Sequence, residues 1–176
     1  MKIMFSAGEA SGDLHGANLA RALRELDPQV ELLGMGGKEM ETAGVDIVYD
    51  IKNLGVIGVG EILRKIPFFF RLRDFLVETM RREKPDVLVC IDYPGFNMRL
   101  IKVAKAAPTI WAWHKSRGKT IAKYTDLAIS LFPFEAKMYE DMGTNVIYTG
   151  HPLVDTVHAT MSRREACAYF GLDERK

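Results

Sequence analysis

The chain has little net charge and few cysteines, and each scarcity narrows the classes of protein it can belong to. Its 24 basic and 23 acidic residues leave a formal net charge of +1, so the overall balance gives no case for nucleic-acid binding. Cys90 and Cys167 are the two cysteines, too few for a disulfide framework, which favours a reducing cytoplasm. His114 has no partner at the spacing of a metal site, and we expect neither a metal nor a cofactor.

Long apolar runs are also lacking. No window approaches the length of a transmembrane helix, and the apolar part of the N-terminal MKIMFSAGEASGD is too short for a signal peptide. The chain is therefore expected to be soluble or peripheral to a membrane. Its 176 residues suit one domain, or one domain and a small part of another, and its 48% hydrophobic content can fill a core.

Short apolar runs alternate with helical patterns along the chain. The runs of strand length cover residues 2–7, 30–33, 45–49, 87–91, 127–131 and 145–148. Helical patterns lie between the first runs, one ended by Asp27 and Pro28 and one closed by Gly44, and Gly34 to Gly37 is expected to be a turn. This alternation predicts an α/β fold, a Rossmann-like parallel sheet with flanking helices. The tail from Val154 is predicted to form one helix.

The stretch DVLVCIDYPGFNM, residues 86–98, places a carboxylate where a buried strand ends. Open α/β sheets bind ligands at the carboxyl ends of their strands, so Asp92 is a candidate catalytic residue. Pro94 and Gly95 are expected to turn the chain into the next helix. The alternative is that Asp92 only organises this turn or caps the helix.

The turn after the first strand carries small and polar residues. Gly8 and Gly12 allow a ligand to approach the backbone, and the N–H groups at a helix start favour anions. Glu9, Ser11 and Asp13 add three polar side chains at the sheet edge where Asp92 is expected, so Glu9, Ser11, Gly12 and Asp13 are candidate substrate-binding residues. The turn is neither a Walker loop nor a complete G-x-G-x-x-G fingerprint, so it names no nucleotide. A tight turn without a ligand is the alternative.

The segment from residue 53 to 86 combines an apolar helical stripe with positive charge. Arginines and lysines surround the stripe, and Pro67 is expected to start or kink a helix. One interpretation is a helix packed on the sheet. The other is a surface that enters a membrane or takes up acyl chains, which three consecutive phenylalanines favour, because all three cannot face one core. The candidate contacts are Val56, Ile57, Val59, Ile62, Leu63, Ile66, Phe68, Phe69 and Phe70.

An aromatic and basic cluster follows Pro108. Trp113 could stack on a sugar or base while Lys115 or Arg117 holds a phosphate, so all three are candidate substrate-binding residues. The alternative is a tryptophan packed beneath a solvated basic turn.

Seven motifs occur along the chain in a fixed order. They are SAGEASGDLHGA (6–17), GMGG (34–37), GVIGVGEIL (55–63), IDYPGFNMRLIK (91–102), WAWHKSRGKTIAKYTD (111–126), PFEAKMYE (133–140) and YTGHPLVD (148–155). Together they resemble the lipid-A-disaccharide synthases, glycosyltransferase family 19. The combination of SAGEASGD, IDYPGFN and GHPL is specific to that resemblance.

The resemblance implies the N-terminal half of a GT-B glycosyltransferase. It implies a reaction that joins UDP-2,3-diacylglucosamine to 2,3-diacylglucosamine 1-phosphate, giving lipid A disaccharide 1-phosphate and UDP, with Asp92 matching the family's proposed base. The implied partners are these two lipids and the cytoplasmic face of the inner membrane of Gram-negative bacteria, without nucleic acid. The oligomeric state is open, and a homodimer is one option. The acylated substrates favour the membrane interpretation of the apolar stripe.

The chain departs from the family pattern in two places. The segment between Ala104 and Ile110 is shorter than in the family, so a family strand is reduced to Thr109 and Ile110 or missing. Residues 1–160 are expected to form the acceptor- and membrane-facing domain, with 161–176 starting a linker to a nucleotide-sugar domain outside this chain. This chain alone is expected to be an incomplete, inactive enzyme. The alternatives are a non-catalytic lipid- or nucleotide-binding module and an enzyme of soluble sugar nucleotides, such as an epimerase of UDP-N-acetylglucosamine.

Overall fold

Four parallel strands form the main sheet of the protein. The structure, a computed structural model, describes residues 1–54, 62–104 and 121–173. The strands are β1 (Lys2–Ala7), β2 (Glu31–Gly36), β3 (Asp46–Asp50) and β4 (Val87–Ile91), in the order β3-β2-β1-β4. The α/β class with a parallel sheet is confirmed. Because β1 and β4 are neighbours, the turns that follow them meet at one edge of the sheet.

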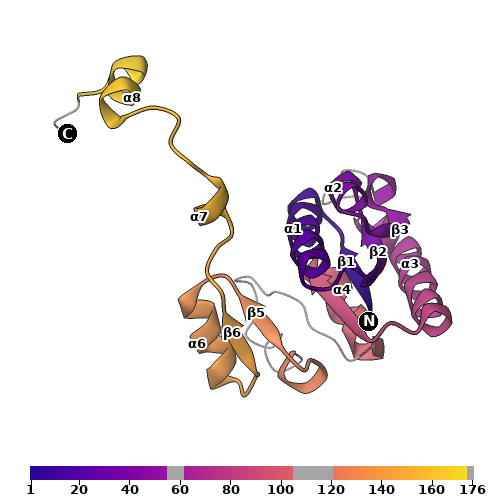
Figure 1. Cartoon of the computed structure of the whole chain (residues 1–176). Helices are drawn as coiled ribbons and strands as arrows, with labels where there is room; N and C mark the ends of the chain where they lie inside the picture. Colours follow the sequence, from indigo (N-terminus) through magenta and orange to yellow (C-terminus); the bar gives the residue numbers. More distant parts are fainter. Residues whose placement is uncertain (55–61, 105–120, 174–176) are drawn as a thin grey trace.

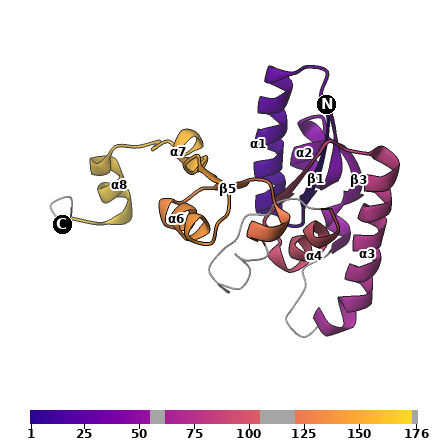
Figure 2. The ribbon, with the colours of Figure 1, turned by 90° about the horizontal axis from the view of Figure 1, so that it is seen from below.

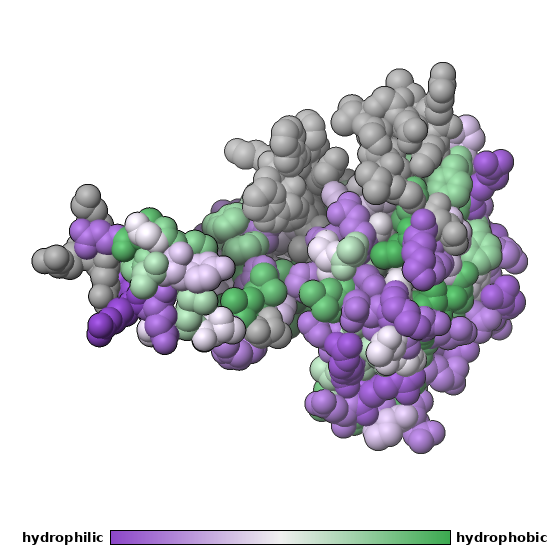
Figure 3. All heavy atoms as spheres, turned by 90° about the horizontal axis from the view of Figure 1, so that it is seen from above, coloured by the Kyte–Doolittle hydropathy of each residue, from purple (hydrophilic) through white to green (hydrophobic). Residues whose placement is uncertain are grey.

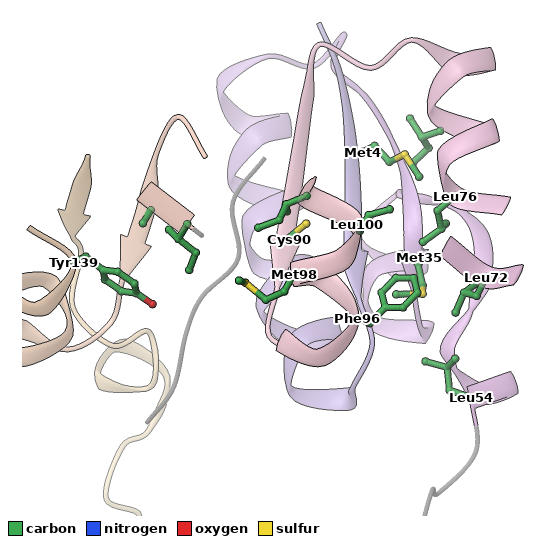
Figure 4. Packing of buried hydrophobic residues seen from close by; sticks show 14 residues of the cluster. Met4, Met35, Leu54, Leu72, Leu76, Cys90, Phe96, Met98, Leu100 and Tyr139 are labelled. Carbon is green, nitrogen blue, oxygen red and sulfur yellow. The ribbon is translucent and has the colours of Figure 1, made fainter. Parts of the chain in front are cut away.

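Helices cover both faces of this sheet (Figures 1 and 2). One layer holds α1 (Ala10–Leu26) and α2 (Lys38–Thr42), and the other holds α3 (Ile62–Glu83) and α4 (Pro94–Ala104); the turn η1 (Ile51–Leu54) follows β3. Side chains alternate along β1, so Phe5 packs under α1 and Met4 under α3. Figure 4 shows the second layer, in which Met4 and Met35 meet Leu72, Leu76 and Phe96.

Strand β2 continues three residues beyond its predicted end. The expected turn at Gly34 to Gly37 is wrong for the first three of these residues, because they belong to β2. Gly34 has a φ of 153°, and a β carbon there would lie 2.2 Å from the carbonyl oxygen of Phe5. The glycine therefore lets β2 lie close against β1 rather than ending the strand.

The last two predicted strands pair with each other. β5 (Ala128–Ser130) and β6 (Val146–Tyr148) form a separate two-stranded parallel sheet, joined by α6 (Pro133–Asp141). Among the described residues, no ladder connects them to β4. The expected strand at Thr109 and Ile110 lies outside the described residues. This smaller unit still shares the core, because Ile121 and Tyr139 belong to the cluster that contains Met98 and Ile101.

The tail contains two helices rather than the one predicted. α7 (Leu153–Thr156) and α8 (Arg163–Phe170) are separated because Val157 is extended and Ser162 begins a new helix. Ser162 and Glu165 form a reciprocal capping box, which satisfies N–H groups at the start of α8. Figure 1 shows α8 reaching away from the sheets, and Figure 3 shows apolar surface on this extension. Across the described segments, no helix is both long and apolar enough to cross a membrane.

Candidate active site

The edge formed by the ends of β1 and β4 gathers the described catalytic and substrate-binding candidates. Ala7 lies opposite Ile91 in the ladder, so Gly8 and Glu9 follow one strand beside Asp92, which follows the other. Helix α1 starts at this edge, with Glu9 as its N-cap residue in extended conformation. The first N–H groups of a helix carry partial positive charge, so this edge can attract an anionic group.

Asp92 and Tyr93 turn the chain from β4 into α4. Their φ values are 48° and 49°, in the left-handed region that residues with a β carbon seldom adopt. The prediction that Pro94 and Gly95 make the turn is wrong, because both residues already belong to helix α4. Pro94 is the first helical residue, where its missing N–H costs nothing. Strained backbone of this kind occurs preferentially at functional sites.

The carboxylate of Asp92 does not cap the helix that follows it. The backbone carbonyl of Tyr93 accepts the N–H groups of Phe96 and Asn97 at the start of α4. The Asp92 side chain is half-buried, and it accepts no hydrogen bond from any residue that the structure describes. The capping alternative is therefore not what the structure shows, and this carboxylate has lone pairs available for a ligand.

A buried pair, Ser6 and Asn97, ties the two strand ends together. The Ser6 hydroxyl donates to Asn97 Oδ1 at 2.7 Å, and Asn97 Nδ2 donates to the carbonyl oxygens of Asp92 at 2.8 Å and Ser6 at 3.1 Å. A longer contact of 3.3 Å joins Asn97 Nδ2 to the carbonyl of Ile91. Both side chains are fully buried. Sequence reasoning missed this pair, although a polar Asn97 among the apolar residues of a helix was a signal.

The ring of Tyr93 lies directly against the first strand-to-helix turn. A β carbon on Gly8 would lie only 2.2 to 2.7 Å from three ring atoms of Tyr93, so the two turns fit together only with glycine at this position. Burial raises the pKa of the Tyr93 hydroxyl, and the nearby charge of Glu9 raises it further. Tyr93 therefore stays a neutral hydrogen-bonding group near neutral pH.

A cavity of about 570 Å³ opens beside Tyr93, between α3, α4 and the turn after β1. Its lining is mainly apolar, with charged residues at some points: Gly8, Glu9, Leu54, Ile66, Phe69, Phe70, Arg73, Tyr93, Gly95, Phe96 and Arg99. The cavity thus connects the apolar stripe of α3 with the edge of the sheet. Its size is in the range of small-molecule sites.

The three consecutive phenylalanines do not share one environment. Phe68 and Phe69 are half-buried and pack against the core, with the Phe69 ring centroid 6.4 Å from that of Phe96. Phe70 is 41% exposed. The expectation that all three cannot face one core is therefore confirmed, but the first two pack inside the protein, because α3 continues through Pro67 and presents them to α4. Ile66, Phe69 and Phe70 are the candidate contacts that line the cavity.

Asp13 is occupied within the protein. Its Oδ1 accepts the N–H groups of Gly37 at 2.7 Å and Met40 at 3.1 Å, and its Oδ2 accepts that of Glu39 at 3.0 Å. Asp13 is 5% exposed, so its carboxylate fixes the start of α2 against α1. Glu9 and Ser11 are exposed and Gly12 is buried, which leaves the first two side chains accessible.

A second carboxylate, Glu135 on α6, lies close enough to Asp92 for their charges to interact. Glu135 is 2% exposed, and its Oε1 is buried without a hydrogen-bond partner among the described residues. Burial raises the pKa of Glu135, against the hydrogen bond from Ser130, and the charge of Asp92 raises it as well. Glu135 was not among the predicted site residues, because only the folded chain brings α6 toward the end of β4.

Comparison with known proteins decides the family. A sequence profile described as lipid-A-disaccharide synthetase matches residues 3–176. This chain belongs to the lipid-A-disaccharide synthetase family. The predicted resemblance is confirmed, and with it the GT-B class that the family implies.

Curated members of the family align with nearly the whole chain. The lipid-A-disaccharide synthases of Geobacter metallireducens and Geobacter sulfurreducens are 43% and 44% identical over 181 residues, covering 98% of this chain and 47% of each relative. That of Coxiella burnetii is 42% identical over 183 residues, covering 99% of this chain and 49% of the relative. The chain thus spans about half the length of these relatives. The aligned lengths exceed 176 residues, which agrees with a segment that is shorter in this chain.

Several predicted site residues of the family pattern lie outside the described residues. These are Val56, Ile57, Val59, Trp113, Lys115 and Arg117. Ile62 and Leu63 begin helix α3. Within the described ranges, no three His, Cys, Asp or Glu side chains gather as they would to hold a metal ion.

Proposed function

We propose that this chain is the acceptor- and membrane-facing part of a lipid-A-disaccharide synthase. The reaction joins UDP-2,3-diacylglucosamine to 2,3-diacylglucosamine 1-phosphate and releases UDP. The observation that carries the proposal is the half-buried Asp92 carboxylate, which is unpaired among the described residues and lies at the ligand-binding edge of the sheet. Residues 1–160 form this part, and 161–176 lead toward the nucleotide-sugar domain.

In this proposal Asp92 acts as the general base. It takes the proton of the acceptor 6-hydroxyl while that oxygen forms a bond to the anomeric carbon of the donor sugar. The bond from this carbon to the UDP oxygen breaks at the same time, and UDP leaves with the electron pair. Glu9, Ser11 and Gly12 at the start of α1 contact substrate, and Asp13 positions their helix. Trp113, Lys115 and Arg117 are proposed to hold the sugar and phosphate groups.

We also propose that the protein works at the cytoplasmic face of the inner membrane. Phe70 is exposed on α3, and Arg71 and Arg73 flank it with positive charge suited to anionic head groups. Because Phe68 and Phe69 pack in the core, the informative variant is Phe70→Ser alone. It should lower co-sedimentation with phosphatidylglycerol vesicles, whereas Phe134→Ser, exposed on α6, should not. Equal sedimentation of the two variants would remove Phe70 from the membrane contact.

The function is tested by UDP release, using the protein encoded by the full reading frame that contains this chain. Asp92→Asn should lower turnover by about 100-fold or more, the scale of losing a positioned base. Asp126→Asn is the matched control, because Asp126 is exposed and lies outside the edge. Near-normal turnover of Asp92→Asn would keep the activity and exclude Asp92 as base. Absence of UDP release from the unmodified protein would favour a non-catalytic binding module.

A further inference from the structure

Glu135 is a buried carboxylate that the chemistry proposed above does not use. It lies in the first turn of α6, shortly after β5, and is 2% exposed. The Ser130 hydroxyl has one proton, which it donates to the Phe132 carbonyl at 2.9 Å, so its longer contact of 3.4 Å with Glu135 Oε2 is weak. Oε1 has no hydrogen-bond partner among the described residues. The carboxylate is therefore removed from water with little to replace it.

A carboxylate in this setting lowers the stability of the fold. Burial of a charge without a partner costs free energy, and native proteins contain few polar atoms that are both buried and unsatisfied. Packing alone does not require the charge at Glu135, because glutamine has nearly the same shape. Costly groups of this kind are concentrated at functional sites, where chemistry needs them.

The charged neighbour of Glu135 is Asp92. Tyr139 on α6 packs in one cluster with Met98 and Ile101 on α4, and this packing brings α6 toward the strand end that carries Asp92. Burial raises the pKa of Glu135 against the hydrogen bond from Ser130, and the charge of Asp92 raises it as well. The two carboxylates therefore interact as like charges.

The other charged or titratable groups around α6 are exposed or occupied elsewhere. The described cations are Lys137, which pairs with Asp141 at 2.9 Å, Lys123, which lies over the Tyr124 ring, Arg99, which lies over the Phe70 ring, and the exposed Lys102. The exposed acidic or phenolic groups are Glu9, Asp126, Glu140 and Tyr148. Within the described part of the chain, no cation forms an ion pair with Asp92 or Glu135.

We propose that Glu135 is a positioning residue for the base, because repulsion between the two carboxylates favours uptake of the acceptor proton by Asp92. This role rests on the proposed function, in which Asp92 is the base. When both carboxylates are ionised they repel each other, and the repulsion ends when Asp92 takes the proton of the attacking hydroxyl. The proton stays on Asp92 while the new C–O bond forms and UDP leaves. Glu135 exchanges no proton with the substrate.

The role predicts two ionisations on the acidic limb of the pH profile of kcat. Turnover rises when the first carboxyl of the pair loses its proton and again when the second does, because only an ionised Glu135 strengthens the base. In the protein encoded by the full reading frame, Glu135→Gln should remove the second rise and lower the plateau about 3- to 10-fold, with the KM for acceptor unchanged. Glu135→Asp keeps the charge and should retain both ionisations.

Thr144→Val is the matched control for the loss of a buried polar atom. Thr144 follows α6, is 7% exposed, and its Oγ1 also has no hydrogen-bond partner among the described residues. Both Thr144→Val and Glu135→Gln keep the size of the side chain, so both should fold with an unchanged or higher Tm. The pH profile should change in Glu135→Gln alone. Equal changes in both profiles would show a structural effect and overturn the role of Glu135.

The interaction between the two carboxyls can be measured without turnover. Carbon-13 NMR of protein labelled at glutamate Cδ follows the titration of Glu135, whose signal is identified by its absence from Glu135→Gln. In Asp92→Asn this signal should titrate at lower pH than in the unmodified protein, because the charge of Asp92 raises the pKa of Glu135. Asp126→Asn removes an exposed carboxylate and should leave the titration unchanged. An unchanged titration in Asp92→Asn would overturn the pairing.

The two measurements separate this role from the function on which it rests. If UDP is released and Glu135→Gln keeps the pH profile of the unmodified protein, the proposed function stands and the role of Glu135 is wrong. If the Glu135 titration shifts in Asp92→Asn but the unmodified protein releases no UDP, the pairing of the carboxylates stands and the enzyme assignment fails.

Discussion

Asn97→Ala is the substitution that most directly tests how the active edge is held together. Asn97 is fully buried on α4 and is the shared partner of Ser6, on β1, and the carbonyl of Asp92, after β4. Removing its amide leaves these groups without their partner in a closed interior. The two strand ends would then be joined by the β1–β4 ladder and by the packing of Tyr93 against Gly8.

The expected cost follows from the bonds that are lost. The amide makes three hydrogen bonds of 2.7, 2.8 and 3.1 Å and one contact of 3.3 Å. At a net value of about 0.5 to 1.5 kcal/mol for each bond, the loss is about 3 kcal/mol. The Ser6 and Ile91 carbonyls are buried, so water cannot replace the amide there without a cavity large enough to hold it. We expect turnover to fall as well, because the carbonyl that Asn97 holds belongs to the proposed base.

Hydrogen exchange measured by mass spectrometry can localise this effect. Peptides that cover β1 and β4 should exchange about 100-fold faster in Asn97→Ala, the factor that corresponds to about 3 kcal/mol. Asn145→Ala is the matched control, since Asn145 is exposed and donates one bond of 3.1 Å to the Asp126 carbonyl. If exchange in β1 and β4 changes no more in Asn97→Ala than in the control, the buried amide does not hold the strand ends and this reasoning is wrong.

Two other predictions concern the same region. Gly8→Ala should displace the Tyr93 ring and cost about 1 to 3 kcal/mol in unfolding free energy, measured in urea, whereas Gly95→Ala should be nearly neutral; similar midpoints for both would contradict the close fit. Because burial raises the pKa of Glu135 above its ordinary 4.5, the folded protein holds that proton more tightly than the unfolded chain does. Stability from this group is therefore lost as the pH rises from about that value through the raised pKa. Glu135→Gln should gain thermal stability relative to the unmodified protein across this window, and parallel profiles of Tm against pH would refute it.

The sequence predicted those features that depend on local pattern. Apolar runs located all four strands of the main sheet, and Gly44 was correctly expected to follow a short helix, where its φ is 85°. The order of motifs was enough to identify the family. Predicted strand ends were wrong where a tertiary contact decides them. At Gly34, the close approach to Phe5 keeps β2 extended beyond its predicted end.

The site was predictable only in outline. Asp92 and Glu9 follow predicted strands, so their common edge could be inferred from parallel topology. The positions of Asn97 and Glu135 at this edge could not, because each depends on a partner far away in the sequence. The phenylalanine run shows the same limit, since helical period alone did not reveal that Phe68 and Phe69 have a partner helix, α4.

The left-handed backbone at Asp92 has a consequence for the evolution of the protein. A glycine would adopt a φ of 48° at no steric cost, whereas aspartate pays about 1 kcal/mol for the same geometry. A single base change converts an aspartate codon into a glycine codon, for example GAT into GGT. A more stable residue at position 92 is therefore one mutation away. If Asp92 is the base, selection for catalysis favours aspartate at this position, whereas selection for stability favours glycine. A search for thermostable variants would then be expected to recover inactive proteins with glycine at residue 92.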